Sequence, residues 1–140
     1  MKEFYKTPTA HIYFDDALDT LFLEYNGRVA NHAQFVEINT AVLKAFQSLN
    51  TQKFVADIRK MGIISIESQQ WVVKNLLPGM IAHLNGRMLY HAQFLDPSEI
   101  MAKVSGSNIK NQSATVAQGF EVVQVSDVES LKKYLMQAGK

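Results

Sequence analysis

Apolar residues along this chain alternate between two spacings, that of a β-strand and that of an α-helix. Short runs rich in apolar and β-branched residues predict strands at 11–15, 20–25, 53–58, 87–95 and 120–125. Apolar residues at steps of three and four predict amphipathic helices, which begin after Asn31, at about Ser65, after Asp96 and after Ser126. The order is therefore β-β-α-β-α-β-α-β-α, which predicts an α/β domain.

This order of elements also predicts how the sheet is built. Strands joined through helices form right-handed crossovers, so we expect a mostly parallel five-stranded sheet, to which the first hairpin adds one antiparallel strand. Most of the strands carry a polar residue, namely His11, Glu24, His91, Gln93 and Gln124. Because strands covered on both faces are apolar throughout, we expect the helices to lie mainly on one face. The other face would be semi-polar and open to a partner or a second copy.

Capping and breaking residues indicate where the helices begin and end. Asn31 with Gln34 has the spacing of a reciprocal N-terminal capping box, and so has the segment 126–129. Pro78 is expected to end or kink the second helix, and the polar segment 105–118 is expected to be a loop. The side chains expected to face the core from the second and the last helix are Ile66, Val73, Leu77, Val128, Leu131 and Leu135.

Composition limits the classes of function open to the chain. Its 140 residues predict a single domain, 1–140, and the absence of cysteine excludes disulfides, thiolate zinc sites and cysteine nucleophiles. A formal net charge of +1 gives no general attraction to nucleic acid or to an anionic membrane. The N-terminus lacks the apolar run of a signal peptide, and no segment reaches about 18 apolar residues. We therefore expect a soluble, cytoplasmic protein without membrane insertion.

The chain carries no recognisable catalytic or cofactor motif. Its four histidines do not have the spacing that puts two metal ligands on one face of an element, and only His11 and His91 could form the nucleus of a metal site. The glycines match neither dinucleotide-binding nor phosphate-binding loops. No GxSxG elbow is present, and no Ser-His-carboxylate order stands out from chance. We expect no catalytic residues, no metal and no cofactor.

The segment 57–71 is the strongest candidate for a binding or regulatory site. It runs from the end of a strand into the start of a helix, where parallel sheets place many functional groups. Asp57 stands at the strand end and could be a satisfied loop carboxylate or an interaction residue, and Arg59 follows it as a second candidate. Ile63 and Ile64, together with Met61, make the loop apolar, so it either packs on its own domain or meets a partner.

The helix that follows this loop begins with two serines. Ser65 is expected to be the N-cap, with Glu67 and Ser68 in the first turn. A phosphate on Ser65 or Ser68 would be favoured by the helix N-terminus and opposed by Glu67; the alternative is ordinary capping. Trp71, the only tryptophan, is either a core residue or an exposed anchor of an interface.

Several stretches of the sequence resemble one known group of proteins. They are the hairpin HIYFDDALDTLFLEYNG, the strand end VADIR, the segment from Ser65 through Trp71 to Pro78, and the ending from Phe120 to Tyr134-Leu135. This pattern, from about residue 10 to 137, resembles the SpoIIAA-like group. That group contains the STAS domains and small stand-alone bacterial STAS-like proteins of uncharacterised function, with the CRAL-TRIO lipid-transfer domains related in fold.

The resemblance implies an interaction or regulatory role and also shows one departure. Anti-sigma-factor antagonists of this group carry a phosphorylatable serine or threonine directly after an aspartate at the position of Asp57. Here Ile58 follows Asp57, so the Asp-Ser phospho-switch motif is missing, although Ser65 could take over the role by position. The lipid-transfer relatives enclose a large apolar cavity and are considerably longer.

Three functional hypotheses follow. The first is a non-enzymatic protein–protein interaction or regulatory module, acting on a protein partner or as a homodimer. The second is a small apolar ligand or lipid-like binding protein, which needs a cavity of about 300 Å³ or more between sheet and helices. The third is an enzyme whose site is assembled from strand ends, for example from Asp57 with His11 or His91.

Overall fold

A six-stranded mixed sheet forms the centre of the computed structural model, which describes residues 1–96, 98, 104, 107–110 and 119–139. The strands are β1 (Lys2–Lys6), β2 (Ala10–Asp15), β3 (Thr20–Tyr25), β4 (Lys53–Asp57), β5 (Leu89–Phe94) and β6 (Phe120–Val125), and they neighbour one another in that order. Pairings β1–β2 and β2–β3 are antiparallel, and the other three are parallel. The α/β class and the mostly parallel pairing predicted from the sequence are confirmed.

The prediction of five strands is wrong by one, because the N-terminal segment forms β1. This strand, with the sequence KEFYK, has charged residues on either side of two aromatic residues, and it pairs with β2 at the edge of the sheet. Lys2 and Lys6, at its two ends, are the kind of residue that protects an exposed sheet edge from pairing with another chain. A run this short and this charged carries too little apolar periodicity to be recognised as a strand.

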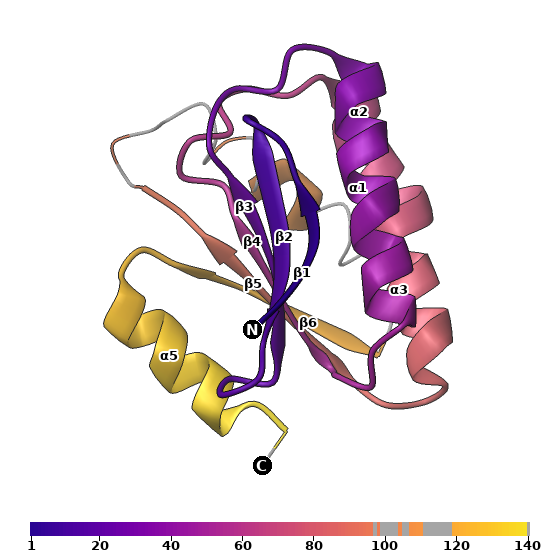
Figure 1. Ribbon diagram of the computed structural model, residues 1–140, viewed down its shortest axis with the longest axis vertical. Helices are drawn as coiled ribbons and strands as arrows, with labels where there is room; N and C mark the ends of the chain where they lie inside the picture. Colours follow the sequence, from indigo (N-terminus) through magenta and orange to yellow (C-terminus); the bar gives the residue numbers. More distant parts are fainter. Residues whose placement is uncertain (97, 99–103, 105–106, 111–118, 140) are drawn as a thin grey trace.

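Helices cover both faces of the sheet (Figure 1). One face carries α1 (His32–Gln47), α2 (Ile66–Trp71), the π-helical turn η1 (Val72–Leu76) and α3 (Leu77–Leu84), whereas α5 (Val128–Gln137) lies on the opposite face. Right-handed crossovers between strands added in one direction place their helices on one face. The last helix has no further strand to reach, so this rule does not apply to it.

Two apolar clusters result, one on each face of the sheet. The larger contains Phe35, Phe46 and Phe54 with residues from α1 to α3, and the smaller packs Leu131 and Leu135 of α5 against the sheet. The strands that α5 covers are therefore not open to a partner. The prediction of a semi-polar open face is corrected in this respect.

The polar strand residues also divide between the two faces. His91 and Gln93 are buried, at 3% and 2% exposure, and lie with Phe54 on the face that carries α1, α2 and α3. Gln124 lies on the same face and donates to Gln93. Glu24 lies beside Asp57 in the sheet, and His11 lies beside Glu24, so these residues project from the other face. Three of the five residues used as evidence for a semi-polar open face, His91, Gln93 and Gln124, thus lie on the face that carries the larger apolar cluster.

Residues 66–84 form one continuous helical segment, although Pro78 was expected to end or kink it. The backbone widens just before the proline, where the Leu77 amide donates to the carbonyl of Val72, five residues earlier. A proline ring would clash with the carbonyl four residues before it in a regular α-helix, and the π-turn changes that spacing. Val73 and Leu77 are buried as predicted, but Ile66 is 67% exposed.

The remaining boundaries confirm some expectations and correct others. Asn31 accepts from the Gln34 amide at 2.8 Å, but Gln34 returns its side chain to the amide of Ala30 instead of that of Asn31. The last helix is capped by Asp127, so Val128 is its first residue and is 51% exposed. Residues 107–110 are helical, whereas the rest of the predicted loop 105–118 lies outside the described residues. No described helix has the length and hydropathy needed to cross a bilayer.

Candidate functional site

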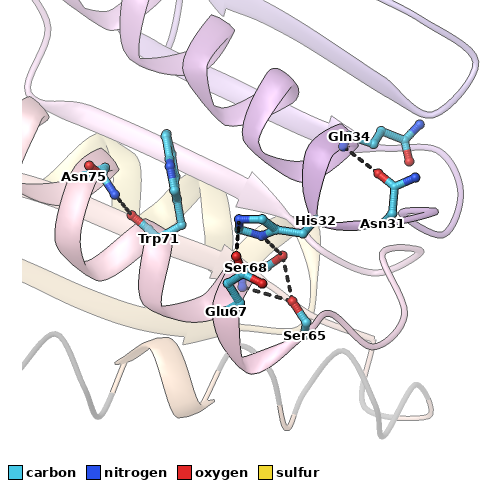
Figure 2. Close-up of polar contacts among 8 residues, drawn as sticks. All are labelled: Asn31, His32, Gln34, Ser65, Glu67, Ser68, Trp71 and Asn75. Atoms are coloured by element: carbon cyan, nitrogen blue, oxygen red, sulfur yellow. Dashed lines mark hydrogen bonds and ion pairs between the residues drawn. The ribbon is translucent and has the colours of Figure 1, made fainter.

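Four polar side chains from two helices form a chain of contacts at one end of the helical layer (Figure 2). Ser65 donates its hydroxyl to Ser68 Oγ at 3.0 Å, and Ser68 Oγ lies 2.8 Å from His32 Nδ1. The other ring nitrogen, His32 Nε2, lies 3.2 Å from Glu67 Oε1. We call these four residues, Ser65, Ser68, His32 and Glu67, the hydroxyl relay.

The donors and acceptors of the relay fit one arrangement of protons. A carboxylate only accepts, so Glu67 favours a proton on His32 Nε2. With Nε2 protonated, neutral His32 accepts at Nδ1, where the Ser68 hydroxyl donates. The Ser65 hydroxyl then donates to Ser68, and the Ser68 amide donates to Ser65 Oγ at 3.0 Å. Every hydroxyl proton in the chain points towards the imidazole.

Local sequence positions the two serines. Met61 and Ile64 are buried at 2% and 6% exposure, so the loop after β4 packs on its own domain at these two residues. Gly62 between them has a φ of +73°, which favours glycine. Ser65 then caps α2 as predicted, and Ser68 follows in the first turn. Packing of α1 beside α2 brings His32 to them from 36 residues away.

A groove of about 160 Å³ lies beside the relay. Its walls come from the segment before α1 and from the loop before α2, and its lining residues are Val29, Ala30, Asn31, His32, Ile63, Ile64, Ser65 and Ser68. Ile63 is 57% exposed, and Ile66 next to the groove is 67% exposed. The apolar loop therefore combines the two predicted arrangements: Met61 and Ile64 pack on its own domain, and Ile63 faces outward, where a partner could contact it.

Asp57 and Arg59 form a separate site at the end of β4. The Asp57 side chain is only 7% exposed and receives two bonds from the guanidinium of Arg59, from Nε at 2.9 Å and from Nη2 at 2.7 Å. Those hydrogen bonds to Asp57 raise the pKa of Arg59. The guanidinium carbon also lies 4.2 Å from the ring centroid of Phe94. Neither residue lines the groove beside Ser65, so the structure divides the predicted site in two.

Removing Arg59 is expected to destabilise the fold, because Asp57 would keep a buried charge without its partner. The guanidinium is 43% exposed, so water can replace part of it, and we expect Arg59→Ala to lower the free energy of unfolding by about 2 kcal/mol. Lys60→Ala removes a neighbouring exposed cation and is expected to cost less than about 0.5 kcal/mol. Urea unfolding of both variants measures the difference, and equal costs would contradict a structural ion pair.

Trp71 does not belong to the relay or the groove. Its side chain is half-buried and packs against the larger apolar cluster, while its carbonyl accepts from Asn75 at 3.2 Å (Figure 2). Of the two predicted roles for Trp71, the structure supports the packing role.

The second hypothesis, an apolar ligand site, finds only a small cavity between the sheet and the helices. Its volume is about 30 Å³, enough for water and far below the about 300 Å³ of ordinary ligand pockets. Several polar side chains line it among apolar ones, including Tyr25, Asn39, His91 and Gln93. A lipid-sized occupant does not fit between the described residues.

The third hypothesis placed Asp57 with a histidine, and the sheet register separates them. His91 faces the larger cluster, whereas Asp57 faces the other side of the sheet. His11 is on the same face as Asp57 but two strands away, about 10 Å, and its Nε2 contacts Glu3 at 3.0 Å. Within the described part of the chain, no three His, Asp or Glu residues are grouped as a metal site would need.

His32 is the member of the site that reasoning from sequence missed. His32 is the first residue of α1, directly after the cap Asn31. A single histidine at such a position, with no second ligand or partner near it in the sequence, is most often a surface residue. The contact of His32 with Ser68 depends on how α1 and α2 pack, which no local pattern encodes.

Comparisons with family models, curated proteins and solved structures find no match to this chain.

Proposed function

We propose that this protein is a regulatory interaction module of the SpoIIAA-like type, which binds a protein partner through its exposed isoleucines. Ile63 and Ile66 are 57% and 67% exposed; Ile63 lines the groove, and Ile66 follows the groove residue Ser65 as the first residue of α2. We call this pair with the groove the docking patch. Its position at a strand-to-helix junction, beside a cluster of hydroxyl groups, is the observation that carries the proposal.

Physical chemistry favours an apolar contact here. The net charge of +1 gives no long-range field to attract a charged partner. Covering each exposed isoleucine contributes about 1 to 2 kcal/mol, since about half of its surface or more is still in water. The hydroxyls of the hydroxyl relay then supply the polar groups that orient a partner at the rim of an apolar contact.

The arrangement of elements supports the SpoIIAA-like part of the proposal. A hairpin is followed by helix-connected parallel strands and a closing helix, which is the order that the resemblance implies, with β1 added in front. Asp57 is held by Arg59 and is followed by Ile58, so the strand end offers no hydroxyl for a switch. If this module is switched, Ser65 is the accessible hydroxyl at the corresponding junction.

Two substitutions test the docking patch without disturbing the core. Ile63→Asp and Ile66→Asp place a charge on the patch, and Ile66 is the first residue of α2, where an acidic side chain suits the helix dipole. We expect each to weaken partner binding at least about 10-fold, as a lost isoleucine anchor does. Val128→Asp is the matched control, because Val128 is 51% exposed at the first position of α5 on the opposite face.

The measurement has two arms. Sedimentation of the purified chain shows whether the partner is a second copy, and affinity capture from extract of the source cells, with mass spectrometry, identifies any other protein. The proposal predicts one complex that both patch variants lose and the Val128→Asp variant keeps. A complex that all three variants retain, or a chain that stays alone in both arms, would contradict it.

A further inference from the structure

We infer that Ser65 is a self-acylation site, which takes a short acyl group from an activated ester or thioester while Ser68 passes its proton to His32. This goes beyond partner binding and does not depend on it, since the reaction involves the hydroxyl relay and partner binding depends on the isoleucines. The relevant features are the accessibility of one hydroxyl, the direction of its hydrogen bonds and the character of the adjoining groove.

Ser65 is the hydroxyl of the relay that a reagent can reach. Its residue is exposed and lines the groove, whereas Ser68 is 2% exposed and lies between Ser65 and His32. A buried serine at that point cannot meet an acyl donor directly, but it can carry a proton. The geometry therefore gives Ser65 the role of nucleophile and Ser68 that of a bridge.

His32 has the contacts expected of a general base. Nδ1 faces the Ser68 hydroxyl at 2.8 Å, and Glu67 holds Nε2 at 3.2 Å, where it stabilises the imidazolium that forms during proton transfer. The Ser68 amide donates to Ser65 Oγ at 3.0 Å, which fixes the position of the attacking oxygen beside the relay.

The reaction balances without a cofactor. Ser65 Oγ forms a bond to the carbonyl carbon of the donor, the Ser65 proton moves to Ser68 Oγ, and the Ser68 proton moves to His32 Nδ1. The bond between the carbonyl carbon and the leaving oxygen or sulfur then breaks. The leaving group takes the proton back from His32 through Ser68, so the products are acyl-Ser65 and a free alcohol or thiol.

The groove selects the size of the acyl group. The groove has a volume of about 160 Å³, and Val29 and Ile63 give it an apolar portion within a lining that is mainly polar, so it accommodates a short acyl chain and not a fatty acyl chain. An acyl group on Ser65 would lie beside Ile63 and enlarge the apolar surface of the docking patch. Acylation would in this way change the surface offered to a partner.

The experiment treats the full chain with p-nitrophenyl acetate and maps the acetylated residues by peptide mass spectrometry over time. Ser130 is the internal reference, because it is exposed and occupies the same position in the first turn of α5 as Ser68 does in α2. Its hydroxyl donates to its cap Asp127, and no histidine of the described residues contacts it. We expect Ser65 to be acetylated about 100-fold faster than Ser130, the gain that a positioned general base gives.

Variants separate the relay from simple exposure. Ser65→Ala removes the modified peptide. His32→Gln and Ser68→Ala are each expected to slow acetylation of Ser65 about 100-fold, while exposed lysines and Ser130 react at unchanged rates. Those unchanged rates, with an unchanged circular dichroism spectrum, show that the variants remain folded. Ser130→Ala leaves the reaction at Ser65 as it was.

A solvent isotope effect distinguishes proton transfer from packing. Acetylation of Ser65 in the wild type is expected to be slower in D2O than in H2O, because protons move along the hydroxyl relay during the reaction. The His32→Gln variant is expected to lose that difference. The inference is overturned if Ser65 reacts no faster than Ser130, or if His32→Gln leaves its rate unchanged. Either result leaves the docking patch untouched, because Ile63→Asp and Ile66→Asp test that patch separately.

Discussion

Lowering the pH from about 6.5 to about 4 is expected to remove about 3 kcal/mol from the stability of the folded protein through one residue, His91. Burial, opposed in part by the hydrogen bond to the Phe54 carbonyl, lowers the pKa of His91 from 6.5 to about 4. The ring stacks on Phe54 with centroids 4.8 Å apart, and Nδ1 donates to the Phe54 carbonyl at 3.0 Å. His91 is therefore neutral in the fold.

The direction of this effect follows from where the proton goes. The unfolded chain takes up a proton on His91 below about pH 6.5, whereas the folded chain takes it up only near pH 4. Acid therefore favours unfolding between these values. The contribution of His91 is fully present above about pH 6.5 and is lost as the pH falls towards 4.

Urea unfolding at pH 7 and pH 4 measures this change when the wild type is compared with His91→Gln. Carboxylates also titrate in this range, but they do so in both proteins, so the difference between the two isolates His91. The variant is expected to be less stable at pH 7 and to lose about 3 kcal/mol less on acidification. His83→Gln, which replaces a half-buried histidine bonded to the Leu49 carbonyl, is the control. Identical pH profiles for wild type and His91→Gln would contradict the argument.

A second large effect is expected at Phe35, which joins the stability of the core to the geometry of the hydroxyl relay. Phe35 is 2% exposed in the first turn of α1, three residues after His32, and it lines the small internal cavity. Phe35→Ala is expected to cost about 4 kcal/mol of stability. The loss would also free the N-terminal turn of α1 to move. A displacement of about 1 Å between His32 and Ser68 would slow acetylation of Ser65 about 100-fold.

Phe46→Ala is the matched control for this prediction. Phe46 is fully buried near the other end of α1, so its truncation should cost a similar free energy while leaving the His32 end of the helix in place. Urea unfolding and Ser65 acetylation are measured on both variants at low temperature, where each remains folded. Phe35→Leu is a milder form of the first change. Equal slowing of acetylation by the two alanine variants would show that lost stability alone explains it.

Much of the fold could be predicted because its strands have strong local signals. The runs at β2, β3, β4, β5 and β6 were all expected within one or two residues. β1 was missed because three of its five residues are charged and its two aromatic residues are adjacent, so it lacks the alternation of a strand. The face of α5 was missed because crossover rules do not constrain a helix after the last strand. Ile66 was expected inside because the helical period was extended across a turn that is not α-helical.

The candidate site was predicted in part for the same reason. Ser65 as an N-cap depends on local backbone chemistry and is confirmed, with Ser68 in the first turn. The division between Ile63 outside and Ile64 inside could not be predicted, because an apolar loop has no period. His32 joins the serines through tertiary packing alone. Arg59 reaches Asp57 within two residues of sequence, yet its distance from Ser65 depends on the path of the loop.

The π-turn η1 changes how the long helix should be counted. Five of its buried residues, Ser68, Val72, Leu76, Met80 and Leu84, keep an interval of four along the whole segment. In a regular α-helix such a row drifts by about 40° at each step and would leave the core face before its end. The wider turn η1 offsets about 100° of that drift, because it holds one extra residue and each residue of an α-helix rotates by about 100°. The angle at which Ser65 and Ser68 meet His32 therefore depends on one extra helical residue in η1, which begins one helical turn beyond Ser68.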